Sequence, residues 1–383
     1  GTSKDAVIPG CSRPGCGGPY KMRKHWIDNL RWVTVLLVLL YHVFYFFNNK
    51  GVIGGIGGFG DGPQYQDIIM YILYPWFMPL LFILAGVSAR YALERCSPKE
   101  WFKARTSKLL VPSTIGLLFF GVFIGWYNSK GAPAGTLDQL PFAVKYFIWV
   151  VSGTGPLWFI QDLWFLSLLL MIIRKLDYKQ KFYNLCGKIG IVPLILIGVL
   201  YWLGHQTLIE NPDPQSAQGL MNLYKPLFYM IPFLMGYFIF PHDRVQEILG
   251  KTWIPLMACA AVAGVVLIAT TFGQDNTLPQ YLQTPLNNIY GWLMCLAMMG
   301  WFKAKFNSTN KFATYMTGSS YGIYIVHYLV IASIGTTLKM STQLQPLCIY
   351  VILTLAVFTL SPLVYEILRR IPFLRWCIFG EKK

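Results

Sequence analysis

Two ionisable residues on one face of a strongly apolar segment, Arg31 and His42, have the clearest capacity for chemistry in this chain. Eleven helical steps of about 100° bring the second side chain back to within roughly 20° of the first. The imidazole then lies roughly 16 Å further along the helix axis than the guanidinium. Ionisable side chains inside an apolar span are costly and mark candidate functional sites. A buried, neutral imidazole is suited to act as a general base.

A structural interpretation of the same residues stays open. Arg31 can extend to the lipid headgroups as a topology anchor, and His42 can be a hydrogen-bonded packing residue. Asp28 lies three residues before Arg31 on the same stripe and is expected to be its partner. The depth of His42 in the span, in line with the arginine, favours a functional role for the histidine.

A second histidine is predicted at a matching depth in another apolar segment. Ser320, Tyr324 and His327 are spaced by four and three residues, so they share a helix face. Two histidines at one depth on separate spans predict a shared polar chamber. The alternative is a tyrosine–histidine hydrogen bond that only joins two helices.

A carboxylate, Asp162, follows Trp158 in a further apolar segment and is expected in the same layer as His42. Inside a bilayer a carboxylate must pair or face water. Asp162 is therefore a candidate to orient a histidine or to bind hydroxyl groups, with a structural hydrogen bond between helices as the alternative.

A basic segment, Lys103, Arg105 and Lys108, lies just before the next predicted span. Cations at this position are explained by membrane topology alone. They are also well placed to hold the phosphates of a cytoplasmic ligand, since an arginine fork matches phosphate oxygens. The spacing does not separate these two roles.

Transmembrane helices are the elements that must position these residues. The chain has 383 residues, of which 55% are hydrophobic and only 13% charged, about half the charge fraction of a soluble protein. Residues 141–152 are predicted as an interfacial or re-entrant piece. Ten apolar stretches are expected to span a bilayer core of about 30 Å: 30–48, 67–92, 109–127, 156–174, 190–206, 225–241, 253–272, 285–302, 317–338 and 346–368. The fold class is therefore all-α, a polytopic membrane protein.

The net charge of +16 is distributed as the positive-inside rule requires. Lys and Arg gather before the first predicted span, after every second span and at the end of the chain. Both termini are therefore expected in the cytoplasm, which agrees with an even number of spans. The basic excess needs no nucleic acid as a partner.

The beginning of the chain is predicted to lie outside the functional domain. Residues 1–21 are expected to be a non-native or disordered leader, and residues 22–383 a single ten-helix transmembrane domain. Cys11 and Cys16 in this leader have no partner at zinc spacing, so no metal site is expected.

Together these motifs resemble the acyltransferase-3 superfamily of integral-membrane acyltransferases, from about residue 22 to the end of the chain. The residues that carry the resemblance are Ile27-Asp-Asn-Leu-Arg31 with His42, Met78-Pro-Leu-Leu-Phe-Ile-Leu-Ala-Gly86, Phe102-Lys-Ala-Arg-Thr-Ser-Lys-Leu-Leu-Val-Pro112, Gly155-Pro-Leu-Trp-Phe159 and Ser320-Tyr-Gly-Ile-Tyr-Ile-Val-His327. The sequence is most similar to the glucan-biosynthesis C type, which is associated with succinylation of periplasmic glucans. The basic segment departs from the relatives, which often carry paired arginines.

The resemblance implies a ten-helix enzyme of the bacterial inner membrane that transfers an acetyl or succinyl group from cytoplasmic acyl-CoA. The acceptor is implied to be a sugar hydroxyl of an extracytoplasmic glycan, and no cofactor is held permanently. The expected partners are acyl-CoA, a carbohydrate and the lipid bilayer. The implied site residues are His42 as general base with Asp162 and His327 as further catalytic residues, Arg31, Lys103, Arg105 and Lys108 for acyl-CoA, and Asp28, Trp158 and Tyr324 for substrate.

A different class of function also fits the residues. A proton-coupled transporter or flippase of a carbohydrate or lipid-linked substrate would use paired histidines to relay protons. An acyl relay, in which a second protein completes the transfer, lies between the two. The acyl group, the acceptor, the use of an acyl-enzyme and the oligomeric state, including a homodimer, are left open.

Overall fold

The computed structural model describes residues 24–49, 55–131, 135–208, 225–274 and 282–381, and all regular elements in these ranges are helical. The all-helical fold class is therefore confirmed for this part of the chain. The leader predicted at residues 1–21 lies outside the described residues.

The helices fall into a long and a short group. The long helices are α1 (His25–Phe46), α2 (Ile68–Leu93), α6 (Trp158–Leu176), α12 (Asp243–Thr271), α14 (Pro285–Lys305), α15 (Lys311–Ser341) and α16 (Pro346–Leu368). The short helices are α3 (Pro98–Leu110), α4 (Val122–Ser129), α5 (Phe142–Ser152), α7 (Lys181–Cys186), α8 (Ile191–Leu196), α9 (Gly198–Leu208), α11 (Pro226–Phe238) and α17 (Pro372–Phe379). Two 3₁₀ turns, η1 (Tyr65–Asp67) and η3 (Gly155–Leu157), precede α2 and α6, and a π-helical turn, η2 (Leu117–Gly121), precedes α4.

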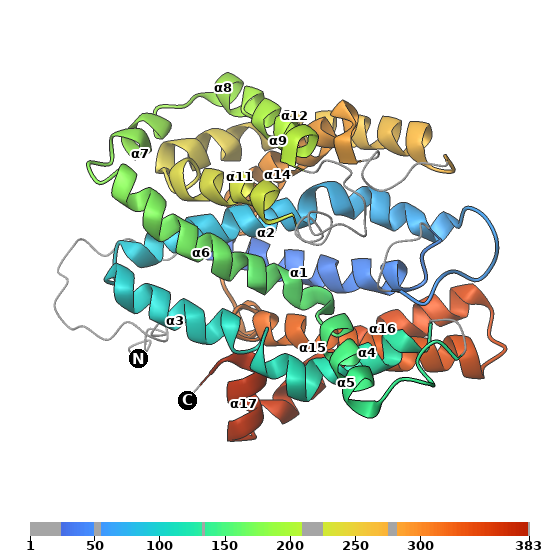
Figure 1. The fold of residues 1–383 in the computed structure, drawn as a ribbon. Helices are drawn as coiled ribbons and strands as arrows, with labels where there is room; N and C mark the ends of the chain where they lie inside the picture. Colours follow the sequence, from blue (N-terminus) through green and yellow to red (C-terminus); the bar gives the residue numbers. More distant parts are fainter. Residues whose placement is uncertain (1–23, 50–54, 132–134, 209–224, 275–281, 382–383) are drawn as a thin grey trace.

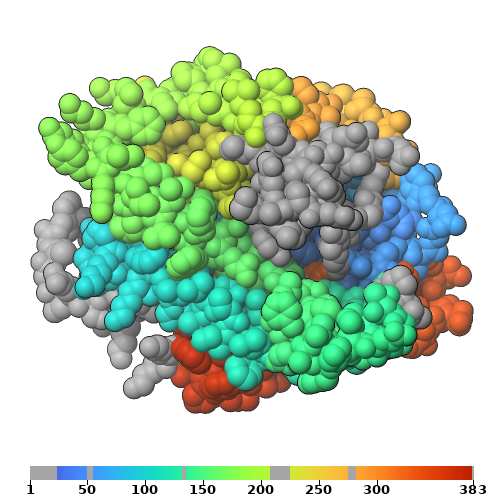
Figure 2. Space-filling model, in the orientation of Figure 1, coloured from blue at the N-terminus to red at the C-terminus, as the bar shows by residue number. Residues whose placement is uncertain are grey.

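Helices α1 and α2 run side by side through the middle of the molecule (Figure 1). On one side α2 packs against α11 and α14, and α12 covers α14. On the other side α1 packs against α15, which α16 and α4 cover in turn. Helix α6 packs against α3 and α11. On the face drawn in Figure 2, α3, α4 and α5 form the lower surface and α7 to α9 the upper one.

Six helices of the described part are long and apolar enough to cross a membrane: α1, α2 with η1, α6 with η3, α12, α15 and α16. Peripheral α12 and α16 expose apolar side chains such as Val262, Val265, Leu355 and Leu363. A soluble monomer rarely tolerates apolar surface on this scale, whereas lipid tails cover it at no cost.

The predicted number of ten spans is not confirmed. Each predicted span falls on helix, but α11 and the helices over 109–127 and 190–206 are short. Helix α14 is long but less apolar than the six. The segment predicted as interfacial or re-entrant, 141–152, forms α5 on the surface against α4.

A proline explains why the predicted span 109–127 is interrupted. Pro112 has no N–H to donate to the carbonyl of Lys108, so α3 ends at Leu110 and a turn follows. The carbonyl oxygen of Lys108 accepts the hydroxyl of Tyr321 on α15 instead. The break therefore binds the end of α3 to α15.

A side chain also replaces a missing backbone donor inside α2. Pro79 leaves the carbonyl of Pro75 without its helical donor, and the hydroxyl of Tyr201 on α9 donates to that oxygen at 2.8 Å. Side chains of neighbouring helices thus satisfy backbone groups that prolines release within the apolar interior.

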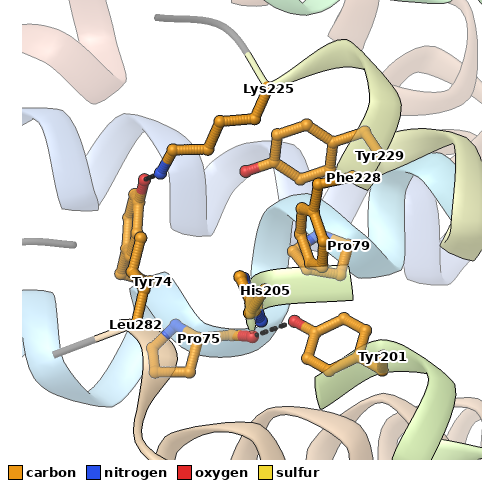
Figure 3. Close-up of a pocket in the computed structure, with 9 residues that line it drawn as sticks. All are labelled: Tyr74, Pro75, Pro79, Tyr201, His205, Lys225, Phe228, Tyr229 and Leu282. Atoms are coloured by element: carbon orange, nitrogen blue, oxygen red, sulfur yellow. Dashed lines mark hydrogen bonds between the residues drawn. The ribbon is translucent and has the colours of Figure 1, made fainter. Parts of the chain in front are cut away.

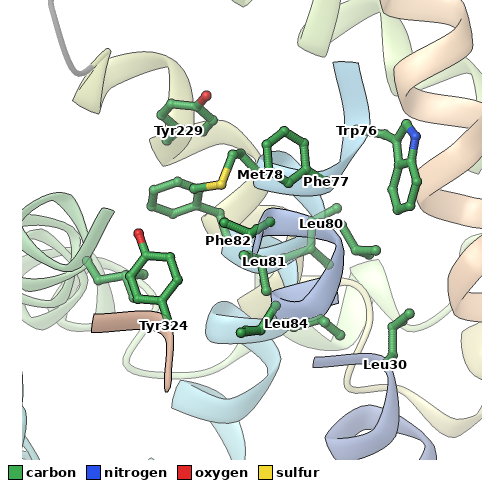
Figure 4. Close-up of a cluster of buried hydrophobic side chains, with 14 of the residues drawn as sticks. Leu30, Trp76, Phe77, Met78, Leu80, Leu81, Phe82, Leu84, Tyr229 and Tyr324 are labelled. Atoms are coloured by element: carbon green, nitrogen blue, oxygen red, sulfur yellow. The ribbon is translucent and has the colours of Figure 1, made fainter. Parts of the chain in front are cut away.

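Close contact between α2 and α11 depends on two glycines. A Cβ on Gly86 would lie 2.1 Å from the carbonyl oxygen of Phe233, and a Cβ on Gly236 would lie 2.1 Å from that of Ile83. Beside this crossing, Phe82 stacks on Tyr229 with a centroid distance of 4.4 Å (Figure 4). Small residues at a helix crossing let the backbones approach, and this packing is a main source of association between membrane helices.

Gly236→Val is expected to destabilise the protein by about 1–3 kcal/mol, since the clash is with rigid backbone rather than with a movable side chain. The measurement is the thermal unfolding midpoint in nanodiscs. Gly318→Val is the matched control, because a Cβ on Gly318 would have no atom of the described chain within 4 Å. An equal loss of stability in both variants would contradict this account of the α2–α11 crossing.

Candidate functional site

The two histidines of α1 and α15 are in direct contact. Nε2 of His327 lies 3.1 Å from Nδ1 of His42, and the ring centroids are 5.0 Å apart. His327 is fully buried, and His42 is partly accessible. The structure therefore brings together the two residues that were predicted to share a polar chamber.

Backbone carbonyls determine which nitrogens of neutral rings carry protons. Nδ1 of His327 lies 2.5 Å from the carbonyl oxygen of Tyr324, which can only accept, so this nitrogen donates and Nε2 is an acceptor. Nδ1 of His42 lies 2.9 Å from the carbonyl oxygen of Val38 and faces the acceptor on His327, so it carries the proton. Nε2 of His42 is then unprotonated, and the described residues give it no hydrogen-bond partner.

Aromatic rings enclose His42 on three sides. The rings of Tyr41, Tyr45 and Tyr328 meet it edge to face, with centroid distances of 5.4, 5.7 and 5.4 Å. Such contacts fix the plane of the imidazole without occupying its free nitrogen. The geometry suits a ring that must accept a proton from a defined direction.

Tyr324 and Trp158 line the region where η3 enters α6. The hydroxyl of Tyr324 donates to the carbonyl oxygen of Pro156. The ring of Trp158 lies 5.3 Å from that of Tyr229. Trp158 thus lies beside the α2–α11 crossing, whereas Tyr324 is bonded to η3, so each already has a structural contact.

Asp162 is buried on α6, and its Oδ2 has no hydrogen-bond partner in the described part of the chain. It lies within electrostatic reach of Tyr229 and Tyr324. No described contact joins it to His42 or His327. The structure therefore associates Asp162 with the tyrosines near η3 rather than with the histidine pair.

Arg31 has the partner that the helical spacing predicted. Its Nη1 lies 3.2 Å from Oδ1 of Asp28, and its Nη2 donates to the hydroxyl of Ser88 on α2 at 2.5 Å. This ion pair confirms Asp28 as an arginine partner. The guanidinium remains partly accessible, with 35% of the side chain exposed, so it can still meet a ligand.

Arg105 lies close enough to Arg31 for the two cations to repel each other. Its Nε donates to the hydroxyl of Ser167 at 3.3 Å, and its guanidinium lies 5.4 Å from the ring centroid of Trp101. Its Nη2 is buried with no partner among the described residues. Burial lowers the pKa of Arg105 to about 10, so the group is still charged at neutral pH. Two guanidinium groups within electrostatic reach of each other, one of them with an unmet donor, suit an anion.

The other two predicted cations differ in position. Lys108 pairs with Glu381 at 3.6 Å and lies 5.0 Å from the ring centroid of Tyr321. Lys103 is exposed on α3, two residues from Arg105 and hence on a different face. No described contact brings Lys103 into the Arg31–Arg105 cluster.

A polar pocket that sequence reasoning missed lies among α2, α9 and α11 (Figure 3). Lys225 donates to the hydroxyl of Tyr74 at 3.3 Å, and His205 contacts Asn288. Tyr74 stacks on Tyr41, the neighbour of His42, with centroids 5.7 Å apart. His205 is a histidine inside a predicted span, so the rule that selected His42 and His327 could have found it.

A family model described as an acyltransferase domain matches residues 24–366. No curated protein and no solved structure matches the chain. Within the described ranges, no three His, Cys, Asp or Glu residues gather as a metal site would require.

Proposed function

The chain belongs to the acyltransferase-3 family, and is thus a multi-pass membrane acyltransferase; from this premise we propose that it transfers an acyl group from acyl-CoA to a sugar hydroxyl of a glycan. The observation that carries the proposal is the Nε2 of His42, which has no hydrogen-bond partner among the described residues, on a ring whose Nδ1 is held by Val38 and His327. A general base must offer an unprotonated nitrogen to the hydroxyl it activates.

In the proposed reaction, Nε2 of His42 takes the proton of the acceptor hydroxyl while its oxygen attacks the thioester carbonyl. The new carbon–oxygen bond replaces the carbon–sulfur bond, and coenzyme A leaves as a thiolate that the imidazolium protonates. No acyl-enzyme is needed. His327 is proposed to stabilise the imidazolium by accepting a hydrogen bond from the Nδ1–H of His42.

The donor is proposed to bind at the other end of α1. Arg31 and Arg105 would hold the diphosphate of acyl-CoA, because guanidinium groups pair with phosphate oxygens in charge-assisted hydrogen bonds. Lys108, and Lys103 from the exposed face of α3, would add positive potential at the entrance. A cytoplasmic location for this end agrees with the distribution of Lys and Arg over the connections.

The acceptor is proposed to approach from the opposite face, beside Tyr74, His205 and Lys225, whose cavity of about 10 Å³ would have to widen to admit a sugar ring. Sugar rings pack on aromatic faces, and the stack of Tyr74 on Tyr41 leads from this pocket to His42. Asp162, Trp158 and Tyr324 are proposed to line the chamber between donor and acceptor. The bacterial inner membrane is the proposed location.

The test is release of free coenzyme A by purified protein in nanodiscs, supplied separately with acetyl-CoA and succinyl-CoA. Release that rises when a glucan is added, together with label from the acyl group on the glucan, is the expected result. Solute flux across a vesicle membrane without consumption of either donor would instead favour a transporter and contradict the proposal.

His327→Phe is expected to lower kcat by about tenfold to a hundredfold while the KM for the donor stays unchanged, because the ring that holds His42 is lost. His327→Gln can accept a hydrogen bond and should recover part of the rate. Steady-state kinetics of coenzyme A release provide the check. A change confined to KM would contradict a positioning role.

A further inference from the structure

A second cavity opens where α2, α6 and α11 end, and two guanidinium groups that the proposed reaction does not use lie in its wall. These are Arg90 near the end of α2 and Arg174 in the last turn of α6. Aromatic side chains, including Tyr178 and Tyr237, complete the lining. Lys and Arg at helix ends are expected in a membrane protein, but the contacts of this pair are not those of simple topology anchors.

Arg90 is held rigidly by its neighbours. Its Nε lies 3.0 Å from Glu94, its Nη2 donates to Oε1 of Gln180 at 2.8 Å, and its guanidinium lies 3.5 Å from the ring centroid of Tyr183. Only 7% of the residue is exposed. A topology anchor would reach into the headgroups, whereas this guanidinium is held in place and contributes a positive charge to the lining of the cavity.

Arg174 has an unmet donor. Its Nη1 is buried, and the described residues offer it no hydrogen-bond partner. The carboxylate of nearby Asp177 accepts from the backbone N–H groups of Phe182 and Tyr183 at 3.1 Å each, so it caps the start of α7. A buried guanidinium donor without an acceptor is costly, and an anionic ligand in the cavity would satisfy it.

The cavity lies at the same end of the bundle as the proposed donor site. Arg174 follows Ser167, the partner of Arg105, by seven residues, which is about two turns or roughly 10 Å along the same face of α6. Arg90 follows Ser88, the partner of Arg31, by two residues on α2. The two groups of cations are therefore about two turns apart along α6 and two residues apart along α2, at the same end of the bundle.

We propose that Arg174 and Arg90 bind the 3′-phosphate of coenzyme A, with the adenine ring against the exposed ring of Tyr178. The inference rests on the proposed function, in which Arg31 and Arg105 hold the diphosphate. Coenzyme A carries these two phosphate groups at separate points, and its adenine can stack on an aromatic ring. A phospholipid headgroup brings a single phosphodiester and no base, so it matches this lining less well.

The experiment compares the dissociation constants of coenzyme A and 3′-dephospho-coenzyme A in nanodiscs that contain only zwitterionic lipid. Wild-type protein is expected to prefer coenzyme A by about tenfold or more. Arg174→Gln should reduce this preference to near one while binding of dephospho-coenzyme A is unchanged, and Arg174→Lys should retain part of it. Lys175→Gln is the matched control, since it removes the same charge from an exposed neighbour and should keep the full preference.

Equal binding of the two ligands by the wild type, or an unchanged preference in Arg174→Gln, would overturn this inference and leave the proposed function intact. Failure of both ligands to bind wild-type protein would overturn the proposed donor and this inference with it. In nanodiscs with phosphatidylglycerol, retention of that lipid by wild type but not by Arg174→Gln, with no effect on coenzyme A preference, would show a lipid site and refute the assignment.

Discussion

His42→Ala is expected to lower the rate of acyl transfer by about a thousandfold while the protein still assembles. The variant loses the unprotonated Nε2, and a positioned general base contributes about 10²–10⁴ to the rate. His42 is only partly buried, so its removal is expected to leave the packing of α1 in place. The measurement is initial release of coenzyme A by protein whose thermal unfolding midpoint matches that of the wild type.

His25→Ala is the matched control, because it makes the same substitution on the same helix at the far end. Its turnover should equal that of the wild type. Added imidazole is expected to restore part of the activity of His42→Ala, since the vacated space can admit a small base. Turnover in His42→Ala within a few fold of the wild type would refute the assignment of the base.

Arg105→Gln is expected to raise the KM for acyl-CoA by about tenfold to a hundredfold with little change in kcat. Charge-assisted hydrogen bonds contribute about 1.5–3 kcal/mol, which corresponds to this range. The buried Nη2 of Arg105 has no partner among the described residues, so a ligand phosphate is its natural acceptor. Steady-state kinetics at varied donor concentration measure the effect, and Arg105→Lys should retain part of the affinity.

Lys99→Gln removes the same charge from the exposed start of the same helix and should leave the KM close to the wild-type value. The prediction fails if both variants weaken the donor equally, because the effect would then be long-range charge alone. Arg105→Gln should weaken coenzyme A and dephospho-coenzyme A alike. This behaviour separates the role of Arg105 from that proposed for Arg174.

Contacts within one helix were predictable from the sequence. The spacing of Asp28 and Arg31 fixes both on one face, so their ion pair follows from helical geometry. The helical class and the equal depth of His42 and His327 followed from hydropathy and the positions of the cations. These properties depend on local periodicity and on the bilayer as solvent.

Contacts between helices were harder to predict, because depth in the membrane does not give rotation or neighbour. Asp162 was expected in the same layer as His42, as a candidate to orient a histidine or bind hydroxyl groups, and its described interactions are with Tyr229 and Tyr324. The Arg90–Arg174 cavity was not predicted from the sequence for another reason. The positive-inside rule already explained both cations, so their sequence positions carried no further signal.

The shortness of α11 has a consequence for the membrane itself. Its 13 residues cover about 20 Å, whereas the hydrocarbon core is about 30 Å thick. Lipid tails next to α11 must compress, or the headgroups must sink, to avoid a hydrophobic mismatch. A thinner hydrocarbon layer beside the crossing with α2 would shorten the distance between the two polar substrates of the proposed reaction, which come from opposite aqueous phases.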